Sequence, residues 1–268
     1  MKRSLLVQQI NNKKSFLCVG LDTDLEKVPD YFRSRPNGIV EFNKQIIDAT
    51  KDYCVSYKIN TAFYESMGAR GWDAMEETCS YIPETHFKIA DAKRADIGNT
   101  SSYYAKAFFE KLNFDAITVA PYMGEDSIRP FLEYENKWTI MLGLTSNQGA
   151  QDFELLKLQN GLLLYERVLE TVSKWGSDQN LMFVVGATQA SELANIRKII
   201  PNHFLLVPGV GAQGGSLLEV ATYGMNPDIG LLVNASRAII YADNGADFAS
   251  KAQQVALEYQ NEMKQFFR

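Results

Sequence analysis

The amino-acid sequence predicts one α/β domain, a (β/α)₈ TIM barrel that spans residues 1–268. Eight short apolar runs of strand character alternate with longer segments of helical period, an order that implies parallel strands. The runs are continuously apolar rather than alternating, which is typical of strands buried on both faces. No Pro/Gly-rich linker divides the 268 residues, and a barrel of this type needs about 250 residues. An open doubly wound sheet accommodates eight repeats less well.

Each predicted strand is followed by a predicted helix or a polar loop. The predicted strands are residues 16–22, 54–60, 86–93, 115–121, 138–145, 181–186, 203–209 and 230–234. The predicted helices are residues 38–53, 62–82, 126–134, 190–200 and 248–267, with two more after the third and fifth strands. We expect Asn99 or Thr100 to cap the helix after the third strand, and the helix after the fifth strand to end near Trp175.

The composition is that of an ordinary globular protein. Hydrophobic residues make up 46% and charged residues 22% of the chain, which excludes extended disorder. The net charge of −5 argues against a nucleic-acid-binding surface, although it allows a local anion site. No run approaches the roughly 20 apolar residues of a membrane span, and the N-terminus has no signal-peptide pattern. We therefore expect a soluble cytoplasmic protein with neither nucleic acid nor membrane as partner.

Cysteine and histidine are scarce and widely spaced. The three cysteines are Cys18, Cys54 and Cys79, and the two histidines are His86 and His203. This pattern favours neither a disulfide framework nor a zinc site. It also makes a Ser-His-Asp or Cys-His mechanism a poor hypothesis, and we expect no metal site.

Polar residues cluster where the predicted strands end, which is where barrels of this type place their chemistry. They are Asp22 after the first strand; Lys58 and Asn60 on the second; Asp91, Lys93 and Asp96 on and after the third; Thr145 and Ser146 after the fifth; residues 209–215 after the seventh; and Ser236 and Arg237 after the eighth.

The charged residues of the third strand are predicted to share one face. Side chains alternate along a strand, so Asp91 and Lys93 point the same way. Lys58, on the neighbouring strand, is within reach of Asp91. An ion-pair network of purely structural value is one interpretation. The convergence of two lysines and two aspartates on the catalytic face favours a functional interpretation. Charges removed from water are unfavourable unless they are paired, and such clusters are typical of functional sites.

The glycine-rich stretch after the seventh strand is a candidate anion site. Gly209, Gly211, Gly214 and Gly215 permit close approach of backbone N–H groups to an anion, and Gln213 adds a side-chain donor. A flexible turn is the alternative. Barrels frequently bind phosphate with the loops after strands seven and eight. Arg237 follows the eighth strand and can bind a phosphate bidentately, so phosphate binding is the better hypothesis.

The stretch Asp91-Ala-Lys-Arg-Ala-Asp96-Ile97, with Thr100 after it, resembles the D-x-K-x-x-D-I signature of the orotidine 5′-phosphate decarboxylase family. Its context is similar to the longer bacterial (type 2) branch of that family. The resemblance also covers residues 21–22, 58–60, 144–147, 208–215 and 236–239, in the same order. Two departures are Ala95, where the branch usually has Gly, and the loop at residues 146–152, which lacks the commoner proline.

The resemblance implies decarboxylation of orotidine 5′-phosphate to uridine 5′-phosphate, the last step of de novo pyrimidine (UMP) biosynthesis, without metal or organic cofactor. It assigns to Lys93 the stabilisation and protonation of the C6 carbanion. Asp91 is placed beside the departing carboxylate. Lys58 is placed to hold Asp91 and reach the ribose, and Asp22 to bind the ribose.

The resemblance further implies a homodimer in which Asp96 and Thr100 cross the interface and complete the partner's site. It places Thr145 and Ser146 near the pyrimidine. It assigns substrate binding, chiefly of the phosphate, to Gly211, Gln213, Ser236 and Arg237.

Three other interpretations remain open. A 3-keto-L-gulonate 6-phosphate decarboxylase has the same barrel and a D-x-K-x-x-D strand, but it needs an acidic Mg²⁺ ligand where this chain has Lys58. A ribulose-phosphate epimerase-like barrel needs metal-binding histidines at strand ends. A non-catalytic phosphate-binding barrel would keep the glycine-rich stretch and Arg237 but has no need for the cluster of Lys58, Asp91 and Lys93.

Overall fold

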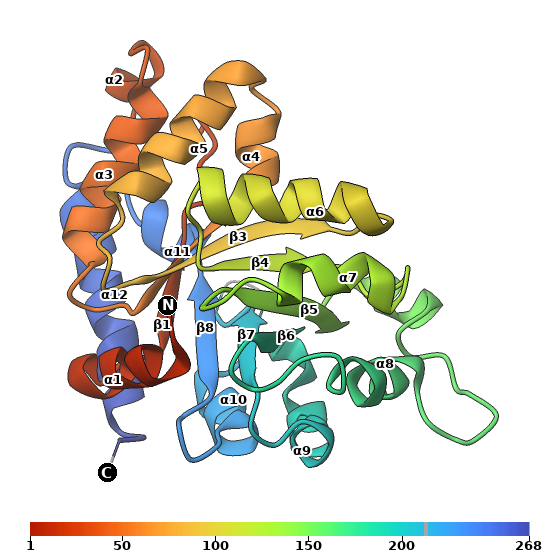
Figure 1. The fold of residues 1–268 in the computed structure, drawn as a ribbon. Coiled ribbons are helices and arrows are strands. Elements are labelled where there is room, and N and C mark those ends of the chain that lie inside the picture. Colours follow the sequence, from red (N-terminus) through yellow and green to blue (C-terminus); the bar gives the residue numbers. More distant parts are fainter. Residues whose placement is uncertain (212–213, 268) are drawn as a thin grey trace.

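A computed structural model describes residues 1–211 and 214–267. Its eight parallel strands form one closed barrel in which each strand pairs with the next and β1 pairs with β8 (Figure 1). The predicted fold class is therefore confirmed. The strands are β1 (Leu17–Gly20), β2 (Ser56–Asn60), β3 (Phe87–Arg94), β4 (Ala116–Val119), β5 (Trp138–Leu144), β6 (Leu181–Val185), β7 (Phe204–Pro208) and β8 (Leu231–Ala235).

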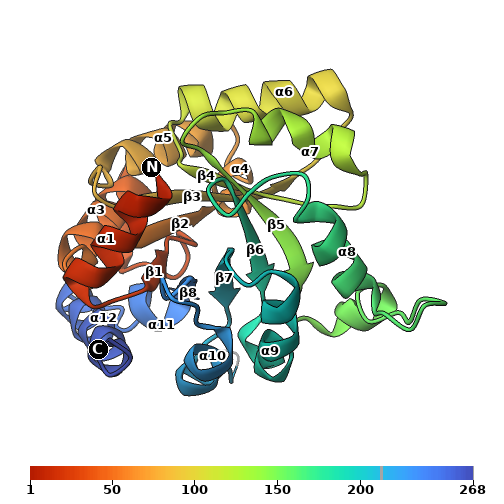
Figure 2. The ribbon, with the colours of Figure 1, turned by 60° about the horizontal axis from the view of Figure 1, so that its bottom comes forward.

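Helices surround the strands on the outside of the barrel (Figure 2). They are α1 (Arg3–Lys13), α2 (Asp30–Arg33), α3 (Gly38–Thr50), α4 (Thr61–Glu65), α5 (Ala69–Tyr81), α6 (Gly98–Lys106), α7 (Glu125–Leu132), α8 (Leu164–Val172), α9 (Ala190–Ile199), α10 (Leu217–Gly224), α11 (Arg237–Ile240) and α12 (Phe248–Lys264), with a π-helical turn η1 (Ala107–Lys111) and 3₁₀ turns η2 (Gln148–Asp152) and η3 (Ala187–Gln189). Among the described residues, no helix combines the length and the apolar character that crossing a membrane requires.

Two helix predictions differ from the structure. The helix expected at residues 62–82 is divided into α4 and α5, because Gly68 has φ +65° and ψ −144° and interrupts the helical path. The helix after β3 begins at Gly98, so Ile97 occupies the N-cap position. Asn99 and Thr100 are the second and third residues of the helix, inside its first turn, and neither caps it.

Large aromatic side chains fill the N-terminal end of the barrel. Phe87, Trp138 and Phe204 are the first residues of β3, β5 and β7, and all three are fully buried. Trp138 makes edge contacts with both phenylalanines, at ring-centroid distances of 5.9 and 6.3 Å. A layer supplied by alternate strands is the packing expected inside a barrel of eight parallel strands. The opposite end of the barrel is thereby left for polar side chains.

Helix α1 covers this N-terminal end. Its buried Arg3 guanidinium donates to the backbone oxygens of Asp178 and Asn202, at 2.6 and 2.8 Å, and pairs with Asp228 at 3.0 Å. These partners precede β6, β7 and β8. The same guanidinium lies 5.0 Å from the ring centroid of Phe204. One side chain therefore joins three strand-start loops and the aromatic layer.

We expect Arg3→Met to lower the free energy of unfolding by about 3 kcal/mol, because it removes a buried guanidinium and leaves the half-exposed Asp228 carboxylate and two carbonyl groups without their donor. Urea unfolding measures the loss. The control is Lys2→Met, which changes an exposed neighbouring side chain and should stay within about 0.5 kcal/mol. Equal stability of the two variants would contradict the role given to Arg3.

Candidate functional site

A cavity opens at the C-terminal ends of β1, β2, β3, β7 and β8. Its volume is about 150 Å³. Five of the predicted site residues line it: Asp22, Lys58, Asp91, Ser236 and Arg237. Asn60, Gly209 and Asn234 line it as well. The structure therefore brings Lys58 and Asp91 of the predicted charged cluster into one cavity with residues of the predicted phosphate side, whereas Lys93 and Asp96 are not among its lining residues.

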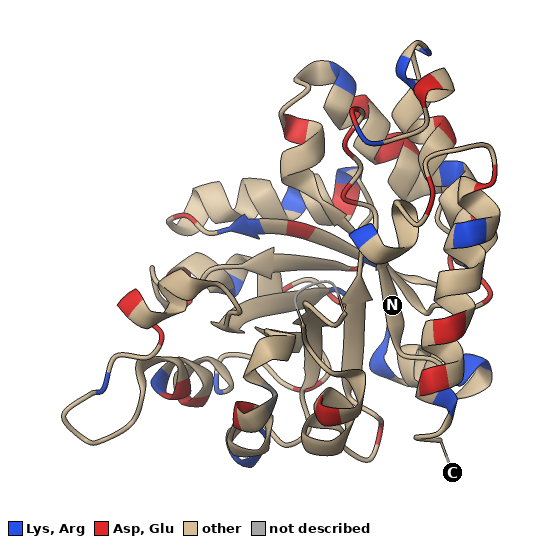
Figure 3. Ribbon diagram, turned by 180° about the vertical axis from the view of Figure 1, so that it is seen from behind, with Lys and Arg blue, Asp and Glu red and all other residues tan. Residues whose placement is uncertain are grey.

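Four charged side chains form a continuous row in and beside this cavity. Lys58 Nζ lies 3.0 Å from Asp22 Oδ1 and 3.1 Å from Asp91 Oδ2. Lys93 Nζ lies 2.6 Å from Asp91 Oδ1. Figure 3 shows the acidic and basic positions on the β3 ribbon next to β4, which has neither. Acidic and basic groups alternate along this row, which we call the charge row.

Because the charge row is largely buried, its charged groups strongly affect one another's pKa values. The Lys58 side chain is 4% exposed and that of Asp91 is 13% exposed. Burial alone would lower the pKa of Lys58, but the carboxylates of Asp91 and Asp22 outweigh it, and the pKa is raised above its usual value. Burial alone would raise the pKa of Asp91, yet Lys58 and Lys93 lower it to about 2. At neutral pH both groups are charged.

An irregularity in β3 places the two predicted catalytic side chains. Ala90 pairs with Ile117 of β4, whereas Arg94 pairs with Val119, so β3 has two extra residues between these pairs. Lys93 lies in this bulge with φ +48°, a conformation that a non-glycine residue seldom adopts. The prediction from strand alternation that Asp91 and Lys93 meet is confirmed, but the strand between them is not regular.

The phosphate side combines the glycine loop with the start of α11. Gly209, Gly211 and Gly214 have φ values of 101°, 72° and 84°. Gly209 lines the cavity, whereas Gly211 donates its N–H to the Gly215 carbonyl at 3.0 Å and lies beside the cavity. The predicted donor Gln213 lies outside the described residues. Arg237 is exposed, and within the part of the chain that the structure describes it makes no ion pair.

Two neighbours of Ser236 were not singled out from the sequence. The Asn234 amide is 7% exposed, donates to Ser236 Oγ at 3.2 Å, and has a side-chain oxygen that is buried with no partner in residues 1–211 and 214–267. A Cβ on Gly20 would lie 1.8 Å from Ser236 Oγ, so the glycine makes room for the serine. Both residues lie inside apolar strand runs, where the sequence offers no signal beyond proximity to a strand end.

The remaining predicted residues lie apart from the charge row. The Thr145 hydroxyl donates to Glu154 at 2.8 Å, and the Thr145 N–H donates to the same carboxylate at 2.7 Å. Ser146 packs against Gly186, at the end of β6. Asp96 accepts from the Ile97 N–H at 2.7 Å. Thr100 is exposed on α6. No ion pair or hydrogen bond among the described residues joins Asp96 or Thr100 to the charge row of the same chain.

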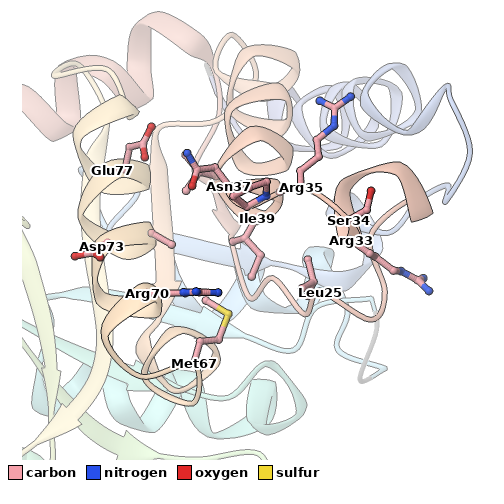
Figure 4. A pocket seen from close by; sticks show the side chains of 14 residues that line it. Leu25, Arg33, Ser34, Arg35, Asn37, Ile39, Met67, Arg70, Asp73 and Glu77 are labelled. Carbon is pink, nitrogen blue, oxygen red and sulfur yellow. The ribbon is translucent and has the colours of Figure 1, made fainter.

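A larger cavity lies elsewhere. It measures about 780 Å³ and lies between the α2–α3 segment and α5. Figure 4 shows that the guanidinium groups of Arg33, Arg35 and Arg70 do not converge there. Arg33 pairs with Asp30, and Arg35 pairs with Glu41. We therefore take the convergence of buried charges, rather than volume, to mark the candidate site.

The donor atoms of the candidate site are those of an ion-pair network. Within residues 1–211 and 214–267, no three His, Cys, Asp or Glu side chains are grouped as metal ligands. The three cysteines are buried and unpaired. The lysine ammoniums at the strand ends are groups suited to binding and stabilising negative charge.

We expect Lys58→Met to lower the free energy of unfolding by about 3 kcal/mol at about pH 7, because breaking a buried ion pair costs about 3–5 kcal/mol. The loss should be smaller at about pH 5. The wild-type Asp91 pKa of about 2 lies below its unfolded value, so its contribution is present at both pH values and is lost as the pH falls through that pKa. In the Lys58→Met variant the pKa of Asp91 should rise, because its cationic partner is gone. Lowering the pH then protonates Asp91 and relieves the repulsion between the carboxylates of Asp22 and Asp91.

Urea unfolding at the two pH values measures this difference. The control is Lys44→Met, which breaks a surface pair with Glu77 at 2.6 Å and should change the free energy of unfolding by less than about 1 kcal/mol. A Lys58→Met loss that is independent of pH would contradict the coupling of Lys58 to the two carboxylates.

The comparisons with known proteins agree with this geometry. The family model described as "Orotidine 5′-phosphate decarboxylase / HUMPS family" matches residues 15–252. The chain is 62% identical over 266 residues to the orotidine 5′-phosphate decarboxylase of Flavobacterium johnsoniae, covering 98% of this chain and 97% of the relative. It is 58% identical, with the same coverages, to that of Bacteroides fragilis.

Solved structures give the same result. The OMP decarboxylase of Leishmania donovani superposes with a TM-score of 0.82 at 37% identity, covering 97% of each chain. The orotidine 5′-monophosphate decarboxylase of Plasmodium berghei superposes with a TM-score of 0.85 at 25% identity, covering 98% of each chain. The similarity thus extends over the whole barrel.

Proposed function

This chain belongs to the orotidine 5′-phosphate decarboxylase / HUMPS family, and we propose that it converts orotidine 5′-phosphate to uridine 5′-phosphate with Lys93 at the centre of the reaction. It is accordingly an enzyme of UMP biosynthesis. The observation that carries the proposal is the charge row, of which Asp22, Lys58 and Asp91 share a cavity with Gly209 and Arg237, while Lys93 pairs with Asp91 beside it. A nucleotide could bind with its pyrimidine ring at the charge row and its phosphate at Gly209 and Arg237.

Lys93 would act where negative charge develops. The bond between C6 and the carboxylate breaks, its electron pair stays on C6, and neutral CO₂ leaves. The Lys93 ammonium attracts the carbanion as it forms and then transfers a proton to C6, which gives uridine 5′-phosphate. The neutral amine regains a proton from solvent. No metal or organic cofactor takes part in this proposal, because the chain's own cation supplies the stabilisation.

The other three members of the charge row would position Lys93 and the substrate. Asp91 accepts from Lys93, and the substrate carboxylate would bind beside it, so the two negative groups would repel until CO₂ leaves. Lys58 holds Asp91 in place from the opposite side. Asp22 pairs with Lys58 and lines the cavity, as a residue that binds a ribose hydroxyl would.

Arg237, Ser236 and the glycine loop would bind the phosphate. The exposed Arg237 guanidinium has the planar geometry for two phosphate oxygens. Asn234 lines the same cavity, and its side-chain oxygen is buried with no hydrogen-bond partner among the described residues. Binding energy gathered at the phosphate can lower the barrier at C6, because it orders the substrate before reaction. The roles of Thr145, Ser146 and Gln213 toward the substrate stay predictions.

We also propose that the site is completed in a homodimer. The Lys93 side chain is 50% exposed in the single chain, which is unusual for an ammonium that must act away from water. Asp96 and Thr100 lie just beyond β3, and the described part of the chain shows no hydrogen bond or ion pair between either of them and Lys93. A second copy that contributes both residues would cover Lys93 and add a carboxylate to the charge row.

We expect Lys93→Ala to reduce turnover by at least about 10⁴-fold, since it removes both the stabilising charge and the proton donor. The fall in near-ultraviolet absorbance of orotidine 5′-phosphate measures turnover, with EDTA present and no metal added. Uridine 5′-phosphate should still raise the melting temperature of the variant. Lys198→Ala, on the exposed face of α9, is the matched control. Turnover that survives in Lys93→Ala would overturn the proposal.

We expect Arg237→Ala to reduce kcat/KM for orotidine 5′-phosphate by about 10- to 100-fold, mainly through KM, because a charge-assisted phosphate contact is lost. The nucleoside orotidine has no phosphate, so its binding, measured by calorimetry, should be the same in both proteins. The kcat/KM of Arg237→Lys for orotidine 5′-phosphate should lie between those of the wild type and Arg237→Ala, since lysine keeps the charge but lacks the planar guanidinium. An unchanged kcat/KM would remove Arg237 from the phosphate site.

A further inference from the structure

Thr118, on β4, contacts both predicted catalytic residues of β3. Its Oγ1 donates to Asp91 Oδ1 at 3.0 Å and accepts from the Lys93 backbone N–H at 2.9 Å. The Thr118 side chain is fully buried. A hydroxyl has one proton to donate and two lone pairs to accept with. Thr118 uses its proton on the carboxylate and one lone pair on the amide.

The position of Thr118 explains why a side chain is needed there. The β3–β4 register passes from Ala90 and Ile117 to Arg94 and Val119, so Thr118 lies opposite the two extra residues of β3. The Lys93 N–H lies within this bulge and donates to the Thr118 hydroxyl instead of to a backbone carbonyl. The hydroxyl thus satisfies a backbone group inside the irregular part of β3.

The bulge gives Lys93 a backbone conformation that is unfavourable by itself. Its φ of +48° is in the left-handed region, which side chains with a Cβ disfavour. On the outer side, the Arg94 guanidinium donates to the Ala92 carbonyl at 2.8 Å, pairs with Glu65, and lies over the ring of Tyr104. Thr118 is the polar contact on the inner side, where the charge row lies.

From these contacts we infer that Thr118 is a positioning residue, which closes the bulge of β3 and thereby fixes Lys93 Nζ against Asp91. Asp91 Oδ1 accepts from both the Lys93 ammonium and the Thr118 hydroxyl, and the same hydroxyl binds the Lys93 amide. Side chain, backbone and carboxylate therefore form one hydrogen-bonded ring. This inference rests on the proposed function, because it concerns the position and orientation of the Lys93 ammonium.

The test compares Thr118→Val, which keeps the shape and removes the hydroxyl, with Thr118→Ser, which keeps the hydroxyl. We expect Thr118→Val to lower kcat by about 10- to 100-fold, because a misplacement of about 1 Å can cost that much. The KM for orotidine 5′-phosphate should change by less than about 3-fold, since the phosphate and ribose contacts remain. Thr118→Ser should keep kcat within about 3-fold of the wild type.

Thr139→Val is the matched control. Thr139 is a buried threonine on the neighbouring strand β5, and its hydroxyl has no hydrogen-bond partner among the described residues. Its replacement should leave kcat and KM unchanged, and it should not lower the melting temperature, because no hydrogen bond is lost. This variant shows what the change from threonine to valine does inside the barrel when no bulge is involved.

Each outcome separates the inference from the proposed function. Loss of turnover in Lys93→Ala with an unchanged kcat in Thr118→Val would overturn the positioning role alone. Turnover that survives in Lys93→Ala would overturn the proposed function. Equal losses of kcat in Thr118→Val and Thr118→Ser would also contradict the inference, because the hydroxyl would then be irrelevant. Should Thr118→Val fail to fold, the kcat of Thr118→Ser against that of Thr118→Ala gives the same comparison.

Discussion

The ion pairs of Lys58 with Asp22 and Asp91 are the interaction on which the cavity depends. A single ammonium that is 4% exposed would be strongly unfavourable without partners. Two carboxylates around it leave one negative charge in excess, and Lys93 balances that charge from the rim. The charge row is therefore neutral as a whole. Its buried half is held by mutual attraction, and its exposed half ends in an ammonium free to face a ligand.

The division of the charge row into a buried half and an exposed half affects the proposed chemistry. Asp91 stays ionised because Lys58 and Lys93 hold its pKa near 2, so it is negative when a carboxylate substrate arrives. Without Lys58, the easier response to a second carboxylate would be protonation of Asp91, which would relieve the repulsion before reaction. Lys58 thus preserves the repulsion that CO₂ release removes, while Lys93 attracts the charge that remains on C6.

The sequence predicted the features that follow from burial and alternation. Strands covered on both faces are continuous apolar runs, so all eight strands could be found. Helix α1 was missed because its buried residues are Arg3, Leu6 and Ile10, one of which is charged, while the apolar Leu5 is exposed, so no continuous apolar stripe marks the helix. The bulge of β3 was missed because no glycine marks the left-handed position at Lys93. The internal hydrogen bond of Gly211 was missed because a glycine-rich stretch does not reveal which of its N–H groups are already used.

Closure of the barrel explains why residues from the two ends of the sequence share one cavity. The described lining residues come from β7, β8, β1, β2 and β3 and the loops after them, which are consecutive around the ring because β8 pairs with β1. Gly20 makes this contact close, since its missing side chain is the space that Ser236 occupies. An open sheet would place β1 and β8 at opposite edges and would separate Asp22 from Arg237. The remaining arc, β4 to β6, acts on the charge row through Thr118. Glu154 binds Thr145 through both its backbone N–H and its hydroxyl, which ties the loop after β5 to the end of that strand.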